Sequence, residues 1–220
     1  MGEKIYPEKV KKWVDLLRNE ADRLRAAAEL GRMGIRTRGP GVMTRGTLRE
    51  PAQPRVEGVD FTPAINALKD QSPEVRREVA FALGEWADET AIDVLALLAT
   101  GDNYDPDPSV RSAVVDALGK IGGQKAVSTL QQVAMDDPEE DVRIRAIGAL
   151  GSLAAKEQPE LVATRGPIVR TRGGVRTRGA TITISPEAQE VLDLLREIRE
   201  SDSSSYVRDI ADETLADLGE

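Results

Sequence analysis

The residues best suited to chemistry in this chain are arginines, because the usual catalytic side chains are missing. The 220 residues include no histidine and no cysteine, which removes the commonest general base, the commonest metal ligand and every thiolate nucleophile. Arginine occurs 22 times, and ten of these residues fall in two short segments that contain none of the eight lysines. The composition therefore indicates anion recognition rather than catalysis.

The two arginine-rich segments differ in composition from the rest of the chain. They read IRTRGPGVMTRGTLREPAQPRVEG at residues 35–58 and TRGPIVRTRGGVRTRGATITI at residues 164–184. Their net charges are +3 and +5, which leaves −16 for the remainder of a chain whose total is −8. A planar guanidinium beside glycine suits bidentate contact with phosphate or carboxylate. The arginines expected to bind a partner are Arg36, Arg38, Arg45, Arg49, Arg165, Arg170, Arg172, Arg176 and Arg178.

Three interpretations of these arginines stay open from the sequence. They could bind an acidic protein surface, on a partner or on another copy of the chain. The protein would then be a non-enzymatic scaffold, and in the second case it would self-assemble. They could instead bind the backbone of RNA or DNA, or a ribonucleoprotein such as the ribosome. The acidic remainder and an aromatic content of only 3% argue against nucleic acid. The third interpretation is that the segments fold back on their own acidic helices, or are surface loops that the fold tolerates.

Motifs of enzymes are missing from the sequence. No Gly-Lys-Ser or Gly-Lys-Thr follows a glycine-rich turn, and no GxGxxG follows a predicted strand. Carboxylate pairs such as Asp136-Asp137 stand in predicted turns, where helix capping explains them better than a metal does. We therefore expect no catalytic residues, no cofactor and no metal.

The elements that position the arginine-rich segments come from a ten-residue unit that the chain repeats five times. Its clearest copy is VRIRAIGALG at residues 142–151, and the others begin at residues 22, 75, 110 and 207. A unit that recurs in this way is the signature of a solenoid. An arginine stands second in every copy: Arg23, Arg76, Arg111, Arg143 and Arg208. A leucine stands ninth: Leu30, Leu83, Leu118, Leu150 and Leu215.

Each copy follows a second amphipathic segment, and the apolar spacing of both predicts a pair of helices. Turns rich in Asp, Ser and Pro, such as DPDPSV, separate the two helices and cap the second. The sequence thus predicts an all-α solenoid of about five helix pairs in one domain, residues 1–220. The predicted units are residues 5–34, 59–88, 89–123, 124–156 and 185–220, with loop or β-hairpin insertions at 35–58 and 159–184.

The stretch DPDPSVRSAVVDALGKIGG at residues 105–123 resembles the HEAT-repeat family, in the short form of phycobilisome-lyase-type proteins. The resemblance implies an all-α solenoid in which the recurring arginine pairs with an aspartate of the preceding turn and ties repeats together. Asp70, Asp105 or Asp107, and Asp136 or Asp137 are the partners that this implies. It also implies one further function, as an accessory protein that attaches or removes a bilin chromophore.

Two smaller predictions complete the sequence interpretation. Residues 168–172 and 175–184 are expected to pair as a hairpin around Gly173-Gly174, because Thr, Val and Ile flank the glycines. The amino terminus lacks the apolar core of a signal peptide, and no window approaches 18 uninterrupted apolar residues. We therefore expect a cytoplasmic location and no membrane contact.

Overall fold

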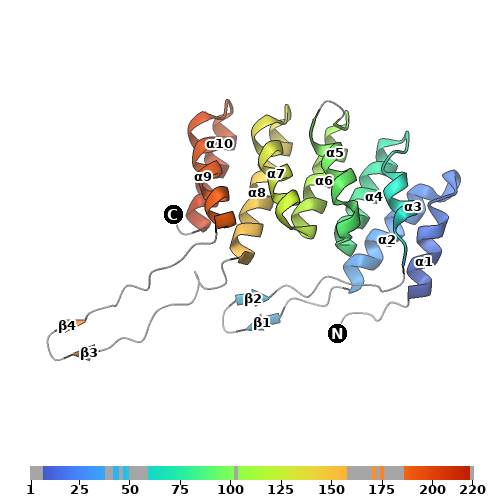
Figure 1. Ribbon diagram of the computed structural model, residues 1–220, viewed down its shortest axis with the longest axis horizontal. Coiled ribbons are helices and arrows are strands. Elements are labelled where there is room, and N and C mark those ends of the chain that lie inside the picture. The colour runs from blue at the N-terminus through green and yellow to red at the C-terminus, as the bar shows by residue number, and fades with distance from the viewer. Residues whose placement is uncertain are drawn as a thin grey trace.

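The protein is a row of helix pairs stacked side by side, seen in a computed structural model (Figure 1). The structure describes residues 7–37, 42–44, 47–49, 59–101, 104–157, 170–171, 174–175 and 186–218, and side chains only for residues 7–35, 59–101, 104–155 and 186–218. The first helices of the pairs are α1 (Pro7–Leu16), α3 (Thr62–Ala67), α5 (Ile92–Ala99), α7 (Gln124–Asp136) and α9 (Pro186–Ser201). The second helices are α2 (Arg23–Thr37), α4 (Pro73–Trp86), α6 (Pro108–Ile121), α8 (Glu140–Glu157) and α10 (Ser205–Asp217).

The predicted all-α solenoid of five helix pairs is confirmed. The pairs follow one another in chain order from α1 and α2 at one end to α9 and α10 at the other (Figure 1). The second helices pack against one another more extensively than the first helices do. Short 3-10 helices that the sequence did not predict, η1 (Glu20–Asp22) and η2 (Glu89–Ala91), lead into α2 and α5.

The core follows the repeated unit. The ninth-position leucines, from Leu30 to Leu215, are at most 2% exposed, and so they anchor each second helix against its neighbours. The tenth-position glycines let these helices approach closely, because a Cβ at Gly84 would lie 2.6 Å from the Cα of Ala117 in the next unit. Between α4 and α2, the indole nitrogen of Trp86 also donates to the carbonyl of Leu30 at 2.9 Å.

Serine and aspartate at the turns start the second helices. Ser72 accepts a hydrogen bond from the backbone N–H of Val75, and Ser204 accepts one from that of Val207. Asp107 caps α6 by accepting from the N–H of Ser109. These caps satisfy backbone donors that have no partner within the helix, so each turn fixes where its helix begins.

Two short antiparallel strand pairs lie within the arginine-rich segments. β1 (Val42–Thr44) pairs with β2 (Thr47–Arg49) in the first segment. In the second segment, β3 (Arg170–Thr171) pairs with β4 (Gly174–Val175), with Arg170 opposite Val175. The remainder of the predicted hairpin lies outside the described residues. The first segment also begins later than predicted, because α2 continues through residue 35 to Thr37; the other unit boundaries stay predictions.

No helix in the described ranges is both long and apolar enough to span a membrane.

Candidate functional site

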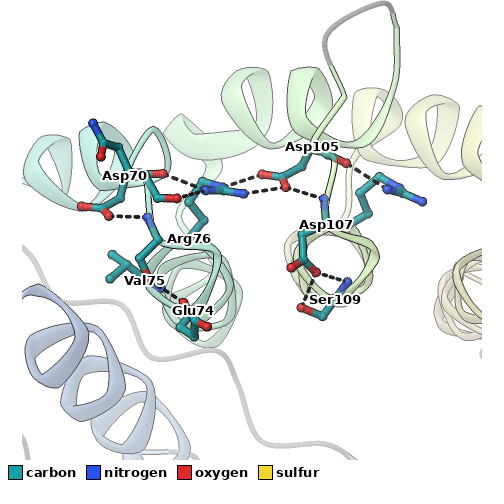
Figure 2. Close-up of polar contacts among 10 residues, drawn as sticks. Asp70, Glu74, Val75, Arg76, Asp105, Asp107 and Ser109 are labelled. Atoms are coloured by element: carbon teal, nitrogen blue, oxygen red, sulfur yellow. Dashed lines mark hydrogen bonds and ion pairs between the residues drawn. The ribbon is translucent and has the colours of Figure 1, made fainter.

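The recurring second-position arginines form a ladder of ion pairs across the turns. Figure 2 shows one rung, in which Arg76 donates from Nε and Nη2 to the two carboxylate oxygens of Asp105, at 2.6 and 2.9 Å. The remaining guanidinium nitrogen, Nη1, donates to the backbone carbonyl of Asp70 at 2.8 Å. One arginine thus binds the carbonyl of its own turn and the carboxylate of the next unit's turn.

The next two rungs have the same geometry. Arg111 contacts Asp137 at 2.8 and 2.9 Å, and Arg143 contacts Asp202 at 2.9 and 3.0 Å. Because the last of these joins residues 59 positions apart in the chain, the second arginine-rich segment does not interrupt the ladder. Whereas the family resemblance implies a partner in the preceding turn, the carboxylate comes from the following one.

The burial and the charge of these ion pairs indicate that they stabilise the fold. The Arg111 and Asp137 side chains are only 3% and 2% exposed, and Asp137 also accepts the backbone N–H of Glu139. Hydrogen bonding to the Asp137 carboxylate raises the pKa of Arg111. Burial tends to raise the pKa of Asp202, but hydrogen bonds from Arg143 and from the Ser204 N–H outweigh it and lower that pKa.

The two ends of the ladder differ from its middle. At the first rung Arg23 donates from Nε to the carbonyl of Leu17 and from Nη1 to a single oxygen of Asp70. At the last rung Arg208 donates to the carbonyl of Asp202 at 2.6 Å, with no carboxylate partner among the described residues. The ladder therefore begins and ends in arginines that make fewer contacts.

The exposed face of the second helices is hollowed on both sides of α4. One hollow of about 460 Å³ lies toward α2, lined by Leu24, Ala28, Arg32, Glu74, Arg77, Glu78 and Phe81. Another of about 440 Å³ lies toward α6 and α8, lined by Arg77, Glu78, Phe81, Ser109, Ser112, Ala113, Asp116 and Arg145. Both hollows share Arg77, Glu78 and Phe81, so we name them together the second-helix groove.

The second-helix groove combines an apolar floor with charged walls. Leu24 is 47% exposed and supplies apolar surface to the hollow beside α2. Across the groove, Arg145 pairs with Asp116 at 3.1 Å, and both side chains remain about half exposed, at 52% and 40%. The Lys120 ammonium lies 4.9 Å from the centre of the Phe81 ring. A ligand with a hydrocarbon chain and charged groups suits this combination.

The sequence interpretation missed the groove, although a signal for it exists. Its lining side chains come mainly from the third, fourth and seventh positions of the repeated unit, such as Arg77, Glu78 and Phe81 in the second copy. These positions change from copy to copy while the second and ninth stay fixed. Variable positions on an otherwise regular repeat mark the surface that is free to specialise.

The nine arginines predicted to bind a partner are not brought together in the described part of the protein. The backbones of Arg36, Arg49 and Arg170 lie in α2, β2 and β3, with side chains outside the described residues. The remaining six lie wholly outside the described residues: Arg38, Arg45, Arg165, Arg172, Arg176 and Arg178. Their partner contacts stay a prediction.

Within the described residues, no group of three or more carboxylates is placed to hold a metal ion. Asp136 lies at the end of α7, and the neighbouring Asp137 carboxylate is engaged by Arg111 and by the start of α8. The carboxylates of this turn therefore serve the helix ends and the ladder.

Comparison with known proteins identifies the repeats and a class of relatives. Residues 61–160 match the profile of HEAT repeats. The chain is 37% identical over 72 residues to deoxyhypusine hydroxylase-B of Oryza sativa subsp. japonica. It is 36% identical over 70 residues to deoxyhypusine hydroxylase of Danio rerio, and 35% over 92 residues to that of Coccidioides immitis (strain RS).

The matched regions are partial. They cover 33%, 32% and 40% of this chain, and 23%, 22% and 27% of the three relatives. Among solved structures, the crystal structure of an engineered protein aligns with a TM-score of 0.51 at 19% identity, covering 96% of this chain and 79% of that one. That likeness concerns the fold alone.

These relatives correct two predictions. The sequence predicted a non-enzymatic scaffold, with nucleic-acid binding or bilin-lyase assistance as alternatives, and it predicted no enzyme. Three relatives named as deoxyhypusine hydroxylases are enzymes, so these predictions were wrong. The error arose because the missing histidine and cysteine were taken to exclude an enzyme, whereas a repeat segment can belong to an enzyme without carrying its reactive groups.

The profile match, the stacked helix pairs and the ladder that joins them agree with one another. Residues 61–160 of the chain are therefore HEAT repeats, and the helix pairs on either side continue the same stack.

Proposed function

We propose that this chain supplies the substrate-binding repeats of an enzyme of the deoxyhypusine hydroxylase kind, and that the second-helix groove holds the substrate side chain. The observation that carries the proposal is the identity of 35–37% with three such enzymes. The groove adds a surface whose chemistry suits the substrate. A cytoplasmic location and a protein partner, the substrate itself, belong to the same proposal.

Deoxyhypusine is a lysine lengthened by an aminobutyl group, so it combines a hydrocarbon chain with two amines. Phe81, Leu24 and Ala113 offer the apolar floor on which methylene groups pack. Glu78 and Asp116 offer carboxylates to the amines, which would replace the arginines that they contact, Arg77 at 3.3 Å and Arg145 at 3.1 Å. Because neighbouring helices are about 8–10 Å apart, a side chain of this length extends from one hollow across α4 toward the next.

The donor set of this chain does not fit an oxygen-activating metal centre of the usual kind. Non-haem iron oxygenases bind the metal through two histidines and a carboxylate, and this chain has no histidine. The described residues also include no suitable cluster of carboxylates. We therefore derive no step of the hydroxylation, and the proposal is limited to holding the substrate.

The test uses a fluorescent peptide with one deoxyhypusine and a matched peptide with lysine at that position. Fluorescence anisotropy with the full chain should show tighter binding of the deoxyhypusine peptide, by about tenfold for one additional charged contact. Glu78→Lys should abolish the preference because it reverses charge in the groove. Asp209→Lys is the matched control, since Asp209 is exposed on α10 away from the groove.

Equal affinity for the two peptides would refute the substrate assignment. If Asp209→Lys and Glu78→Lys reduce the preference equally, binding results from general charge attraction, and the groove is not the binding site. A second readout is mass spectrometry of the peptide after incubation with the chain in air and ferrous iron. Gain of an oxygen atom would show that this chain itself supplies the oxidising centre, and the proposal that it only holds the substrate would then be wrong.

A further inference from the structure

A third hollow lies at the turns rather than on the second-helix face. It occupies about 470 Å³ between the α1–α2 turn, α3 and the turn that leads into α4. Its lining residues are Leu17, Arg18, Arg23, Asp60, Thr62, Pro63, Asn66, Ala67, Lys69 and Asp70. Because it adjoins the first rung of the ladder, we name it the first-rung pocket.

The pocket contains an arginine whose hydrogen-bonding capacity is partly unused. In the second to fourth rungs, both Nε and Nη2 donate to one carboxylate. In the first rung, Nε of Arg23 turns to the carbonyl of Leu17 at 3.0 Å, and only Nη1 reaches Asp70, at 2.5 Å. Nη2 of Arg23 therefore has no acceptor among the described residues, and the Arg23 side chain is 29% exposed.

Two more cations line the same pocket. The Arg18 side chain is 68% exposed, lies 3.9 Å from Asp15 and interacts electrostatically with Asp60 of the pocket lining. Lys69 lies on the surface, and its side chain makes no hydrogen bond or ion pair within the described part of the chain. The three cationic side chains thus retain free N–H donors in a chain whose net charge is −8.

The carboxylates of the pocket are partly occupied. One oxygen of Asp60 accepts both the backbone N–H and the hydroxyl of Thr62, at 2.9 and 2.5 Å. Asp70 accepts the N–H of Ser72 at 2.9 Å on one oxygen and Arg23 on the other. The lining thus has three cationic side chains against two carboxylates, and this excess of positive charge favours an anion over a cation.

We propose that the first-rung pocket binds a small oxyanion, a carboxylate or a phosphate group, through Nη2 of Arg23, Arg18 and Lys69. Nη2 of Arg23 offers its N–H groups to an oxygen of the anion, since Nε and Nη1 are engaged by Leu17 and Asp70. Lys69 adds an ammonium that adjusts to the ligand's position. The site is separate from the second-helix groove and does not depend on the function proposed for that groove.

The test is calorimetric titration of the full chain with inorganic phosphate and, separately, with acetate, at constant ionic strength set with sodium chloride. A saturable heat with either anion is expected. The tighter of the two identifies the ligand class, a phosphate group or a carboxylate. Constant ionic strength matters because surface charges are otherwise screened as salt is added.

The variants remove charge without touching the ladder. Arg18→Gln combined with Lys69→Gln should weaken binding about tenfold, as expected for two partly exposed charged contacts. Lys11→Gln combined with Lys125→Gln removes the same charge from surfaces outside the pocket and should leave binding unchanged. Circular dichroism before titration shows that both variants retain the helical fold.

Two results would overturn the proposal. One is the lack of a saturable heat with both anions. The other is an equal loss of affinity in the two double variants, because that would trace binding to net charge rather than to this pocket.

Discussion

Replacement of Arg111 by methionine tests whether the ladder holds the solenoid together. Arg111 and Asp137 are only 3% and 2% exposed, with two bonds of 2.8 and 2.9 Å between them. Methionine keeps the aliphatic stem but leaves the Asp137 carboxylate buried with a single donor, the N–H of Glu139. It also removes the bond of 2.9 Å to the carbonyl of Asp105. Leaving a buried charge without its partner costs about 3–5 kcal/mol.

The matched control is Arg145→Met, on the neighbouring second helix. Its pair with Asp116 is open to solvent, with side chains 52% and 40% exposed. Exposed pairs contribute about 0.2–1 kcal/mol, so the two methionine variants should differ in unfolding free energy by at least about 2 kcal/mol. Adding Asp137→Asn to Arg111→Met removes the orphaned charge while keeping an oxygen for the Glu139 N–H. This double variant should be less unstable than the sum of the two single changes by about 1–3 kcal/mol.

Urea unfolding followed by far-ultraviolet circular dichroism and tryptophan fluorescence measures these differences. Coincident transitions from the two signals are needed, because repeat arrays can unfold in stages and a single free energy then has no meaning. If Arg111→Met and Arg145→Met are equally stable within about 0.5 kcal/mol, the ladder does not stabilise the stack and the reasoning from burial is wrong.

Three further predictions concern helix contact, pH and capping. Gly84→Ala should destabilise the protein by about 1–3 kcal/mol, because the new Cβ would lie 2.6 Å from a backbone atom of α6. A Cβ at Gly148 would meet nothing within 4 Å, so Gly148→Ala should stabilise the protein by up to about 1 kcal/mol in the same urea assay. The pKa of the Asp202 carboxyl lies below its usual 3.8 in the folded protein, so the ionised carboxylate stabilises the fold fully above pH 3.8 and loses this effect as the pH falls further. On acidification, the urea midpoint of Asp202→Asn should therefore fall less than that of the native chain. Ser204→Ala removes the cap of α10 and should cost about 1 kcal/mol, whereas equal stability of Ser204→Ala and the native chain would show that the cap is unimportant.

The fold was predictable because the residues that pack the helices recur at fixed positions of the repeated unit. Leucine in the ninth position and glycine in the tenth recur wherever a second helix meets its neighbour, and each has one physical role, to fill the core or to allow close approach. The first helices were also recognisable, because their apolar residues recur at the helical period. Local patterns of this kind need no knowledge of distant contacts.

The direction of the ladder was not predictable, because it depends on contacts between residues that are distant in the sequence. An arginine in the second position stands near an aspartate in its own turn, and the sequence alone does not reveal that it reaches forward to the next unit. The distance along the chain varies from 26 residues for Arg111 to 59 for Arg143. Only the stacking of the helix pairs brings these groups together, and the intervening arginine-rich segment hides the last pair from any search by spacing.

The separation of fixed from variable positions bears on what the relatives mean for function. The second, ninth and tenth positions form the ladder, the core and the helix contacts, so identity at these positions would follow from a shared scaffold. The third, fourth and seventh positions line the second-helix groove, through residues such as Glu78, Phe81 and Asp116. The Glu78, Phe81 and Asp116 side chains are half-buried, but they take no part in the ladder or in the buried core. Exchange of these three residues between copies of the unit should therefore change ligand preference while costing less unfolding free energy than changes in the ladder or the core, which separates the function of these repeats from their stability.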